Sequence, residues 1–279
     1  MAITNFIPTV WSETLYKELD KRYVAVANCN RDFEGDIKDQ GSVVKICGVG
    51  SIDINTYTKN GVMIQPQSLS DTVCELTIDQ AKYFNFQIDD IDRVQCSPKL
   101  MDAAMRNAAS GLAADADQYV YSLCNDHPNR FRQDYLSFDN IFETIVDARE
   151  RLYECGVYDD TEVVLEISPA VASILYKAKV KLSTDNSSAL ETGCIGTIAG
   201  CKVFVTHGIR SDPDVSGVDL HLCVMRTKRA ITFAEQLSEI VAYRPEQRFA
   251  DAVKGLHLYG AKIVYPEELL IVEMGVPGN

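Results

Sequence analysis

The chain has 279 residues, 46% of them hydrophobic, and a formal net charge of −13 at pH 7. This length is enough for one large domain or two, and the acidic balance disfavours functions that rest on strong contact with nucleic-acid phosphates. No run of about eighteen apolar residues occurs, so no membrane span is expected, and the N-terminus lacks the pattern of a secretory signal. The nine cysteines occur singly and without a CxxC pair, which favours buried thiols in a reducing compartment.

Residues 1–35 are expected to begin as an extended segment and to continue as a short helix. Trp11, Leu15 and Leu19 recur every four residues, which is the spacing of one helix face. Trp11 is the only tryptophan, and two interpretations of it stay open. It is either a local packing anchor or a contact with another chain.

Residues 42–89 are expected to form a long antiparallel excursion. An apolar strand leads out, Asn60 and Gly61 give a strong reversal signal, and a return strand runs from Val73 to Asp89. A two-stranded ribbon standing alone is marginally stable in water. The excursion is therefore expected to rest on something else, such as a neighbouring subunit.

The tip of this excursion carries four candidate intersubunit contacts. They are Tyr57, Lys59, Met63 and Ile64. Apolar side chains at an exposed tip should find cover in an interface. Lys59 and Asn60 also suggest covalent cross-linking between subunits, but such residues are common in turns and the question stays open.

The longest helical signal runs from Ser97 to Asn125. Ser97 is a suitable N-cap and Pro98 occupies the first helical position, where its missing N–H is tolerated. The expected buried stripe is Met101, Met105, Ala108, Leu112, Ala116, Tyr119 or Val120, and Leu123. The residues expected off this stripe are Asp102, Arg106, Asp115, Asp117 and Gln118. A helix of this span is roughly 40 Å long, so we expect it to brace several other elements.

The rest of the chain mixes helices and strands without a regular strand–helix–strand rhythm, which indicates an α+β fold. The expected helices are one over 138–155, capped by Ser137 and stopped by Gly156, and one from Ser168-Pro169 to Lys179. The expected strands lie at 161–167, within 195–206, at 219–226 and at 269–274. A further long strand is expected around Leu256 to Ile263, with an interruption at Gly260.

The sequence shows no catalytic, cofactor or metal site. It contains no phosphate-binding loop and no nucleophile elbow, and Gly48-Val49-Gly50 is only half of a dinucleotide-binding motif. The four histidines lack ligand-like spacing. Asp89, Asp90 and Asp92 could hold a divalent cation, but a solvated loop is the favoured interpretation. We therefore predict a protein that is not an enzyme.

Three segments resemble one family of proteins. They are NFIPTVWSETL at 5–15, LTIDQAKYFNFQIDDID at 76–92 and RPEQRFADAVKGLHLYGAKIVYPEEL at 244–269. Each is similar to a segment of the major capsid proteins of tailed double-stranded DNA phages, in particular the group of the P22 coat protein. The resemblance follows nearly the whole chain in order, which makes it more specific than any single motif.

The resemblance implies an HK97-type capsid fold with an N-arm, an extended β-hairpin loop, a long spine helix, and peripheral and axial domains. The implied boundaries are 1–40 for the N-arm, 41–90 for the extended loop, 91–160 with 240–279 for the spine helix and peripheral domain, and 161–239 for the axial domain. The large inserted domain of some relatives is not evident, so roles attached to it are not carried over.

The implied function is structural. Copies of the chain would form hexamers and pentamers of an icosahedral shell that encloses phage double-stranded DNA through weak contacts. A scaffolding protein, a portal and a decoration protein are further implied partners, and no cofactor or membrane is. The chain would be located in the virion capsid after assembly in the host bacterial cytoplasm. Two alternatives stay open, namely the shell of an encapsulin-like protein compartment and a soluble enzyme whose site is not recognisable.

Overall fold

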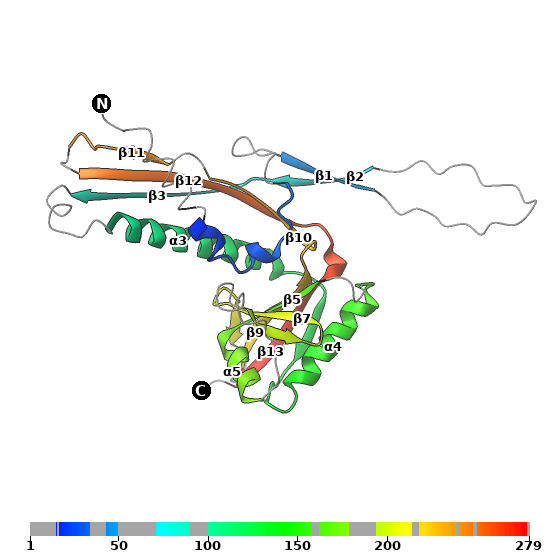
Figure 1. The fold of residues 1–279 in the computed structure, drawn as a ribbon. Coiled ribbons are helices and arrows are strands. Elements are labelled where there is room, and N and C mark those ends of the chain that lie inside the picture. Colours follow the sequence, from blue (N-terminus) through cyan, green and yellow to red (C-terminus); the bar gives the residue numbers. More distant parts are fainter. Residues whose placement is uncertain are drawn as a thin grey trace, which may run out of the picture.

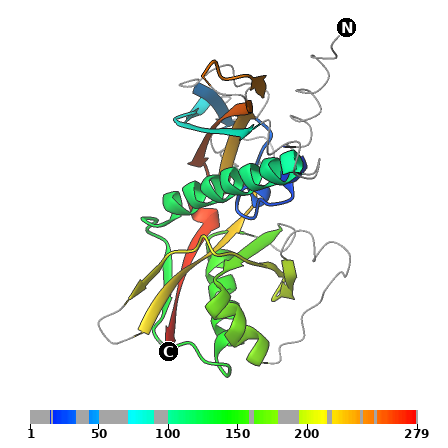
Figure 2. The ribbon, with the colours of Figure 1, turned by 90° about the vertical axis from the view of Figure 1, so that its left-hand side faces the viewer.

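The computed structural model describes residues 15, 17–33, 43–49, 71–89, 100–157, 162–178, 194–213, 218–237, 240–247 and 250–277. Figure 1 shows two parts, an elongated layer in which long strands run beside helix α3, and a compact body below it. In the view turned by 90°, α3 lies between the two parts (Figure 2). No helix of these described ranges is both long enough and apolar enough to cross a membrane.

The elongated layer contains a four-stranded sheet, in which three strands pair with one central strand, and we call it the long sheet. The strands are β3 (Gln80–Asp89), β10 (Ile231–Leu237), β11 (Val241–Tyr243) and the central β12 (Ala250–Ile263). All three pairings with β12 are antiparallel. The register places Tyr83 opposite Leu256, and Val241 opposite Lys254. The central strand therefore organises the whole layer.

Strand β12 continues through Gly260, where the sequence predicted an interruption. The reason for this glycine is a close approach of another segment. A Cβ atom at Gly260 would lie 2.3 Å from the carbonyl oxygen of Thr77 and 3.1 Å from the Cα of Ile78. Only glycine leaves room for that crossing, so the residue marks a contact between backbones and does not end the strand.

The predicted return strand, Val73 to Asp89, is two strands with different partners. β1 (Val43–Val49) pairs with β2 (Asp71–Thr77), whereas β3 leaves this pair and joins β12. The buried apolar side chains at the root of the excursion are Val44, Ile46, Leu76 and Ile78, which pack with Ala234 and Leu258. The excursion was expected to rest on another element, such as a neighbouring subunit, and its root rests on the long sheet of its own chain. Residues 50–70 lie outside the described residues.

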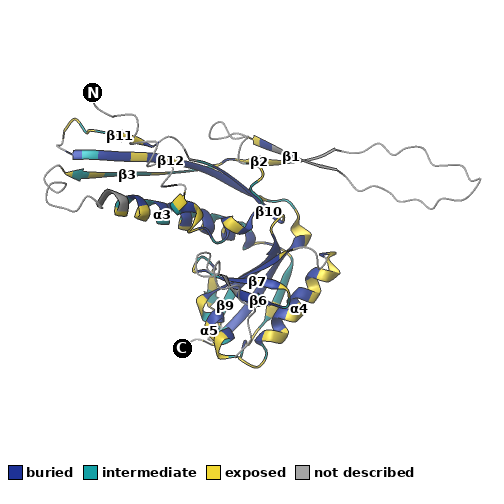
Figure 3. Ribbon diagram, viewed as in Figure 1, coloured by how far each residue is buried: buried dark blue, intermediate teal, exposed yellow. Residues whose placement is uncertain are grey.

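Helix α3 (Leu100–Cys124) confirms the predicted long helix, although Ser97 and Pro98 lie outside the described residues. Its buried side chains are Met105, Ala109, Leu112, Ala113, Ala116, Asp117, Val120, Tyr121 and Cys124 (Figure 3). The predicted stripe was wrong at Ala108, which is only half-buried, and at Asp117, which was expected off the stripe. The helix is covered on more than one side because it packs against both the long sheet and the segment around η1 (Val26–Asn28).

The compact body is built on a mixed seven-stranded sheet, which we call the body sheet. Its strands are β4 (Arg130–Gln133), β5 (Val163–Ile167), β6 (Cys194–Ile198), β7 (Cys201–Val205), β8 (Ser211–Pro213), β9 (Val218–Thr227) and β13 (Leu269–Pro277). The order is β4-β13-β9-β5-β7-β6, and β8 pairs with β9. The β4–β13 and β5–β7 pairs are parallel and the others antiparallel. This mixed arrangement fits the predicted α+β class.

Two helices cover the body sheet. α4 (Ile141–Glu154) begins three residues later than predicted, because the turn before it is closed by a bond from the Ser137 N–H to the Asn140 side chain, 2.8 Å. It ends as predicted near Gly156, whose φ of 91° suits glycine. α5 (Pro169–Lys177) has the predicted cap, in which the Ser168 hydroxyl accepts the Val171 N–H at 3.3 Å.

The two sheets group the chain differently from the predicted domains. β4, α4 and β13 belong to the compact body, whereas the predicted boundaries place 91–160 and 240–279 together with the spine helix. A short helical turn, η3 (Pro266–Glu268), separates β12 in the long sheet from β13 in the body sheet. The chain therefore passes between the two parts at this turn.

Candidate functional site

The outer face of the long sheet exposes apolar side chains. The side chains of β3 alternate, and Phe84 and Phe86 pack against the core around α3 while Tyr83 is 75% exposed. Leu256 lies opposite Tyr83 on β12, and Val241 is exposed nearby. A shallow groove of about 390 Å³ is lined by Tyr83, Phe84, Asn85, Val241, Lys254, Gly255 and Leu256. Contiguous exposed apolar groups of this kind mark interaction surfaces.

A buried ion pair within the body sheet holds the segment around η1. Arg226 on β9 and Glu166 on β5 are fully buried, and their closest N–O distance is 3.0 Å. The same guanidinium donates to the carbonyl oxygens of Ala25, at 2.8 Å, and Asn28, at 2.9 Å. Since every one of these charges and carbonyls has a partner, the cost of burying the pair is offset locally. Arg226 thus ties the η1 segment to two strands of the body sheet.

Asp117 of α3 fixes the other side of the η1 segment. Its carboxylate accepts the N–H of Val24 at 2.9 Å and the N–H of Val26 at 3.0 Å. Burial raises the pKa of Asp117 to about 6, although these N–H donors act in the opposite direction. The η1 segment is therefore held between a carboxylate of the helix and the guanidinium of the body.

Glu235 on β10 is the centre of a second buried polar cluster. It accepts from Tyr23 at 2.5 Å and from Arg31 at 2.7 Å, and His257 Nε2 lies 2.8 Å from the same carboxylate. Burial alone would raise the pKa of Glu235, but bonds from His257 and Tyr23 and the charge of Arg31 bring the pKa below its usual value. The cluster fastens the N-terminal segment to the long sheet.

None of the five predicted contact residues can be placed. Trp11, Tyr57, Lys59, Met63 and Ile64 all lie outside the described residues. Leu15 and Leu19, from the same predicted helix as Trp11, are buried in the core with α3. The sequence interpretation missed Tyr83, Val241 and Leu256. The available signal was Tyr83 itself, an aromatic residue at an outward position of a strand whose following outward positions, 85, 87 and 89, are polar.

Candidates for a metal-binding or catalytic site are few among the described residues. Within those ranges no group of three histidine, cysteine or acidic side chains could hold a metal ion. A polar cleft of about 690 Å³ lies between α3 and the loop that follows β7, and its lining includes Arg22, Asp117, Tyr121 and His207. Asp117 is already engaged by backbone N–H groups, so the arrangement resembles a structural joint more than a nucleophile with its base.

No family model matches the sequence, and no curated protein does. Solved structures do match. That of Mycobacterium phage Che8 is 27% identical and has a TM-score of 0.69 over 90% of each chain. The capsid of Ralstonia phage GP4 is 12% identical, with a TM-score of 0.69 over 91% of this chain and 90% of that one. The virus-like particle from Pyrococcus furiosus is 13% identical, with a TM-score of 0.54 over 94% and 96%.

The likenesses extend over both parts of the molecule, because each covers about nine-tenths or more of this chain. The predicted fold of a tailed-phage major capsid protein is therefore confirmed, while the narrower grouping with the P22 coat protein stays a prediction. The chain therefore has the fold of phage capsid proteins, and its mixed helices and strands fit the HK97-like class.

Proposed function

We propose that this chain is the major capsid protein of a tailed double-stranded DNA phage. Copies of it assemble into hexamers and pentamers, which close into the icosahedral shell of the virion. The observation that carries the proposal is the likeness to solved phage structures, a capsid among them, over about nine-tenths of both chains, which leaves no large part of the subunit without a counterpart. The role is structural and needs no cofactor.

The outer face of the long sheet supplies a surface for assembly. Tyr83 and Leu256 leave apolar area open on a face that α3 does not cover. We assign the tip of the extended loop, including Met63 and Ile64, as its occupant from a neighbouring copy. A loop on one copy and a sheet on the next form a heterologous contact, which closes into a ring when the rotation suits. Tyr57, Lys59 and Trp11 are further contact candidates under the same proposal.

The domain division is also a proposal. The N-arm keeps its sequence boundary, 1–40, α3 is the spine helix, and the extended loop, predicted as 41–90, ends before β3, which belongs to the long sheet. The pairing of strands supports assigning the long sheet to the peripheral domain and the body sheet to the axial domain. Under this assignment α4 and β13 move from the peripheral to the axial domain.

Further partners follow from the role of a shell. A scaffolding protein, a portal and a decoration protein are proposed, with assembly in the host bacterial cytoplasm. The formal net charge of −13 favours a wall that confines packaged DNA by closure, since strong phosphate binding requires a basic face. Any contacts with the DNA are therefore weak.

Electron microscopy of the purified chain, alone and co-expressed with the other proteins of its source, tests the proposal. Closed shells that are empty or filled with DNA are the expected result. Shells that hold a specific protein cargo would favour a protein compartment, an alternative suggested by the likeness to the virus-like particle from Pyrococcus furiosus. Small monodisperse oligomers under all conditions would contradict both shell functions.

A loop replacement tests the assembly surface. Exchanging Asn55–Gln67 for a short Gly-Ser turn should leave the melting temperature of the unassembled subunit nearly unchanged, because loop length alters closure entropy only slightly. Shell formation should fail. Normal closed shells from this variant would contradict the loop contact, and a variant that cannot fold would show that the loop belongs to the subunit core.

A further inference from the structure

The outward side of α4 carries an apolar stripe. Phe142 and Val146 are four residues apart on the helix and are 47% and 39% exposed, and Phe138, in the turn before the helix, is 60% exposed. The adjacent side of α4 already packs on the body through Ile141 and Ile145, each one residue before an exposed apolar side chain. A helix whose two sides are both apolar has one side left for a partner.

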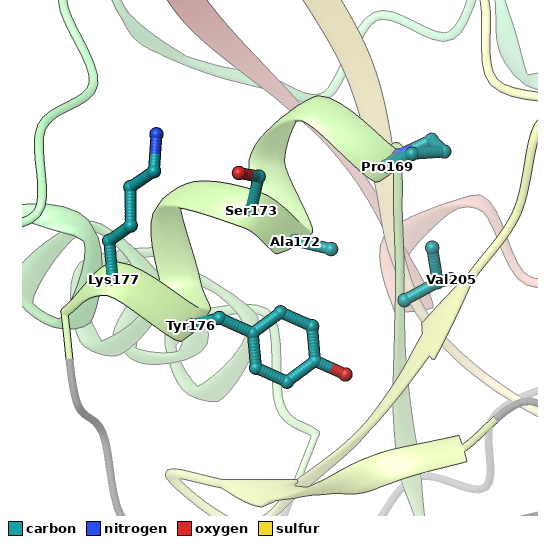
Figure 4. Close-up of a pocket in the computed structure, with 6 residues that line it drawn as sticks. All are labelled: Pro169, Ala172, Ser173, Tyr176, Lys177 and Val205. Atoms are coloured by element: carbon teal, nitrogen blue, oxygen red, sulfur yellow. The ribbon is translucent and has the colours of Figure 1, made fainter.

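The flank formed by α5 carries a hollow. An open pocket of about 660 Å³ lies beside this helix, and Figure 4 shows its lining of Pro169, Ala172, Ser173, Tyr176, Lys177 and Val205. The ring of Tyr176 extends along the side on which Val205 lies, and this tyrosine is 60% exposed. The pocket is thus an apolar hollow with a lysine at its margin.

Charge also distinguishes the two flanks. The exposed acidic residues of α4 are Glu143, Asp147, Glu150 and Glu154, with Arg151 among them. The pocket beside α5 carries the opposite charge, because Lys177 at the end of that helix is exposed and belongs to the lining. An acidic apolar ridge and a basic apolar hollow are complementary, which is what two copies in register require.

The positions of the two flanks decide how copies can meet. In Figure 1, α4 forms the right side of the compact body and α5 its left side. A contact between unlike patches of identical chains is heterologous and propagates from copy to copy until it closes. A self-complementary pair of α4 ridges would instead bring acidic faces together.

We propose that the α4 ridge of one copy inserts into the α5 pocket of the next copy, around each hexamer and pentamer. This inference rests on the proposed capsid function and names a second contact within it. It shares no described residue with the groove around Tyr83 on the long sheet. The body and the elongated layer of each subunit therefore each contribute one contact to the ring.

Cysteine cross-linking tests the proposal directly. In a background with Cys155→Ser, which removes an exposed thiol, Phe142→Cys and Ser173→Cys are introduced together, and assembled shells are treated with a short bismaleimide. The expected result on a denaturing gel is a ladder that ends at five and six chains. Each single variant should remain monomeric, because the contact pairs unlike positions.

Three outcomes of this experiment would overturn the proposal. Dimers from Phe142→Cys alone would show ridge against ridge, and shells without any ladder would show that the two flanks do not meet. A cross-link that closes within one chain would show that the pocket is covered by its own subunit. All three leave the capsid function standing, whereas a parent chain that forms neither shells nor rings contradicts both.

A second pair of variants covers the case in which the double-cysteine protein fails to assemble. Phe142→Asp should reduce the yield of shells at least about tenfold, as expected for a contact residue at the centre of an interface. Tyr265→Asp is the control, because Tyr265 is similarly exposed (41%) but lies on neither flank. Both variants should melt within a few degrees of the parent. Equal shell yields would overturn the inference.

Discussion

The elongated layer and the compact body bury their apolar surface in different ways. In the body, alternate residues of β9 and β13 face two separate cores, one shared with α3 and one shared with α4 and α5. In the layer, α3 covers one face of the long sheet, and the other face leaves Tyr83 and Leu256 open. The cores of the body are enclosed by its own helices, whereas within the described residues no helix covers the face of the layer that carries Tyr83 and Leu256.

The contacts of Arg226, which join the η1 segment to the body sheet, should show the largest effect on stability. Arg226→Leu leaves Glu166 buried without a counter-charge and also frees two carbonyl oxygens, so the expected loss is about 3–5 kcal/mol of unfolding free energy. Lys228→Ala is the control, because its 3.5 Å pair with Glu162 is half-exposed and its loss should cost about 0.5 kcal/mol or less. Denaturant unfolding measures both, and equal losses would contradict this role of Arg226.

The contact between α3 and the layer comes next. Ala109→Asp places a carboxylate at a fully buried position and should cost about 3 kcal/mol or more. Ala108→Asp is the matched control, since the neighbouring residue is only half-buried and should tolerate the charge far better. Thermal melts compare the two directly. A greater loss at Ala108 would mean that the helix is rotated from the described orientation.

A smaller, pH-dependent effect should come from Asp117. Its folded pKa of about 6 lies above the usual value of 3.8, so the folded state binds the proton more strongly. The contribution of this group to stability is fully present below about pH 4 and is lost as the pH rises through 6. Relative to the parent, Asp117→Asn should therefore gain roughly 1 kcal/mol between pH 5 and pH 7.5.

Denaturant midpoints at those two pH values measure the gain for Asp117→Asn. Glu235 supplies the contrast, because the pKa of its carboxyl is lowered. Its stabilising contribution is present above the unfolded pKa and is lost as the pH falls. A constant difference between parent and Asp117→Asn across the range would contradict the raised pKa.

Substitution of Tyr83 should have the smallest effect on subunit stability and a large effect on assembly. Tyr83→Ser changes an exposed side chain of the layer, so the stability of the unassembled subunit should move by no more than about 0.5 kcal/mol. Shell yield, measured by sedimentation, should fall. Tyr265→Ser, at an exposed position of neither proposed surface, should leave both quantities unchanged. A loss of subunit stability at Tyr83 would mean that the outer face belongs to the subunit core.

Local signals explain which parts of the fold could be predicted. The Ser168 cap and the Gly156 stop depend on a few neighbouring residues, and both are confirmed. The partner of β3 could not be inferred locally, because Gln80 pairs with Tyr259 far along the chain. The burial of Asp117 depends on N–H groups of the distant η1 segment, which no helical periodicity can reveal.

The candidate surface was harder to predict than the fold. The sequence drew attention to Met63 and Ile64 because turn signals mark a loop tip, and the described residues do not reach them. Tyr83 and Leu256 are separated by more than 170 positions, so only their pairing across β3 and β12 makes them one surface. Exposed apolar groups become informative only after folding shows which ones are neighbours.

The length of β12 has a mechanical consequence. Its 14 residues span roughly 46 Å, and antiparallel partners flank it along most of that distance. The hydrogen bonds run across the strand, so a pull along its axis loads them in shear and many must break together. A pull across the sheet would open them one after another. If β12 lies along the direction in which internal pressure stretches a shell, the pressure loads these hydrogen bonds in shear. The sheet resists shear better than it resists being opened bond by bond.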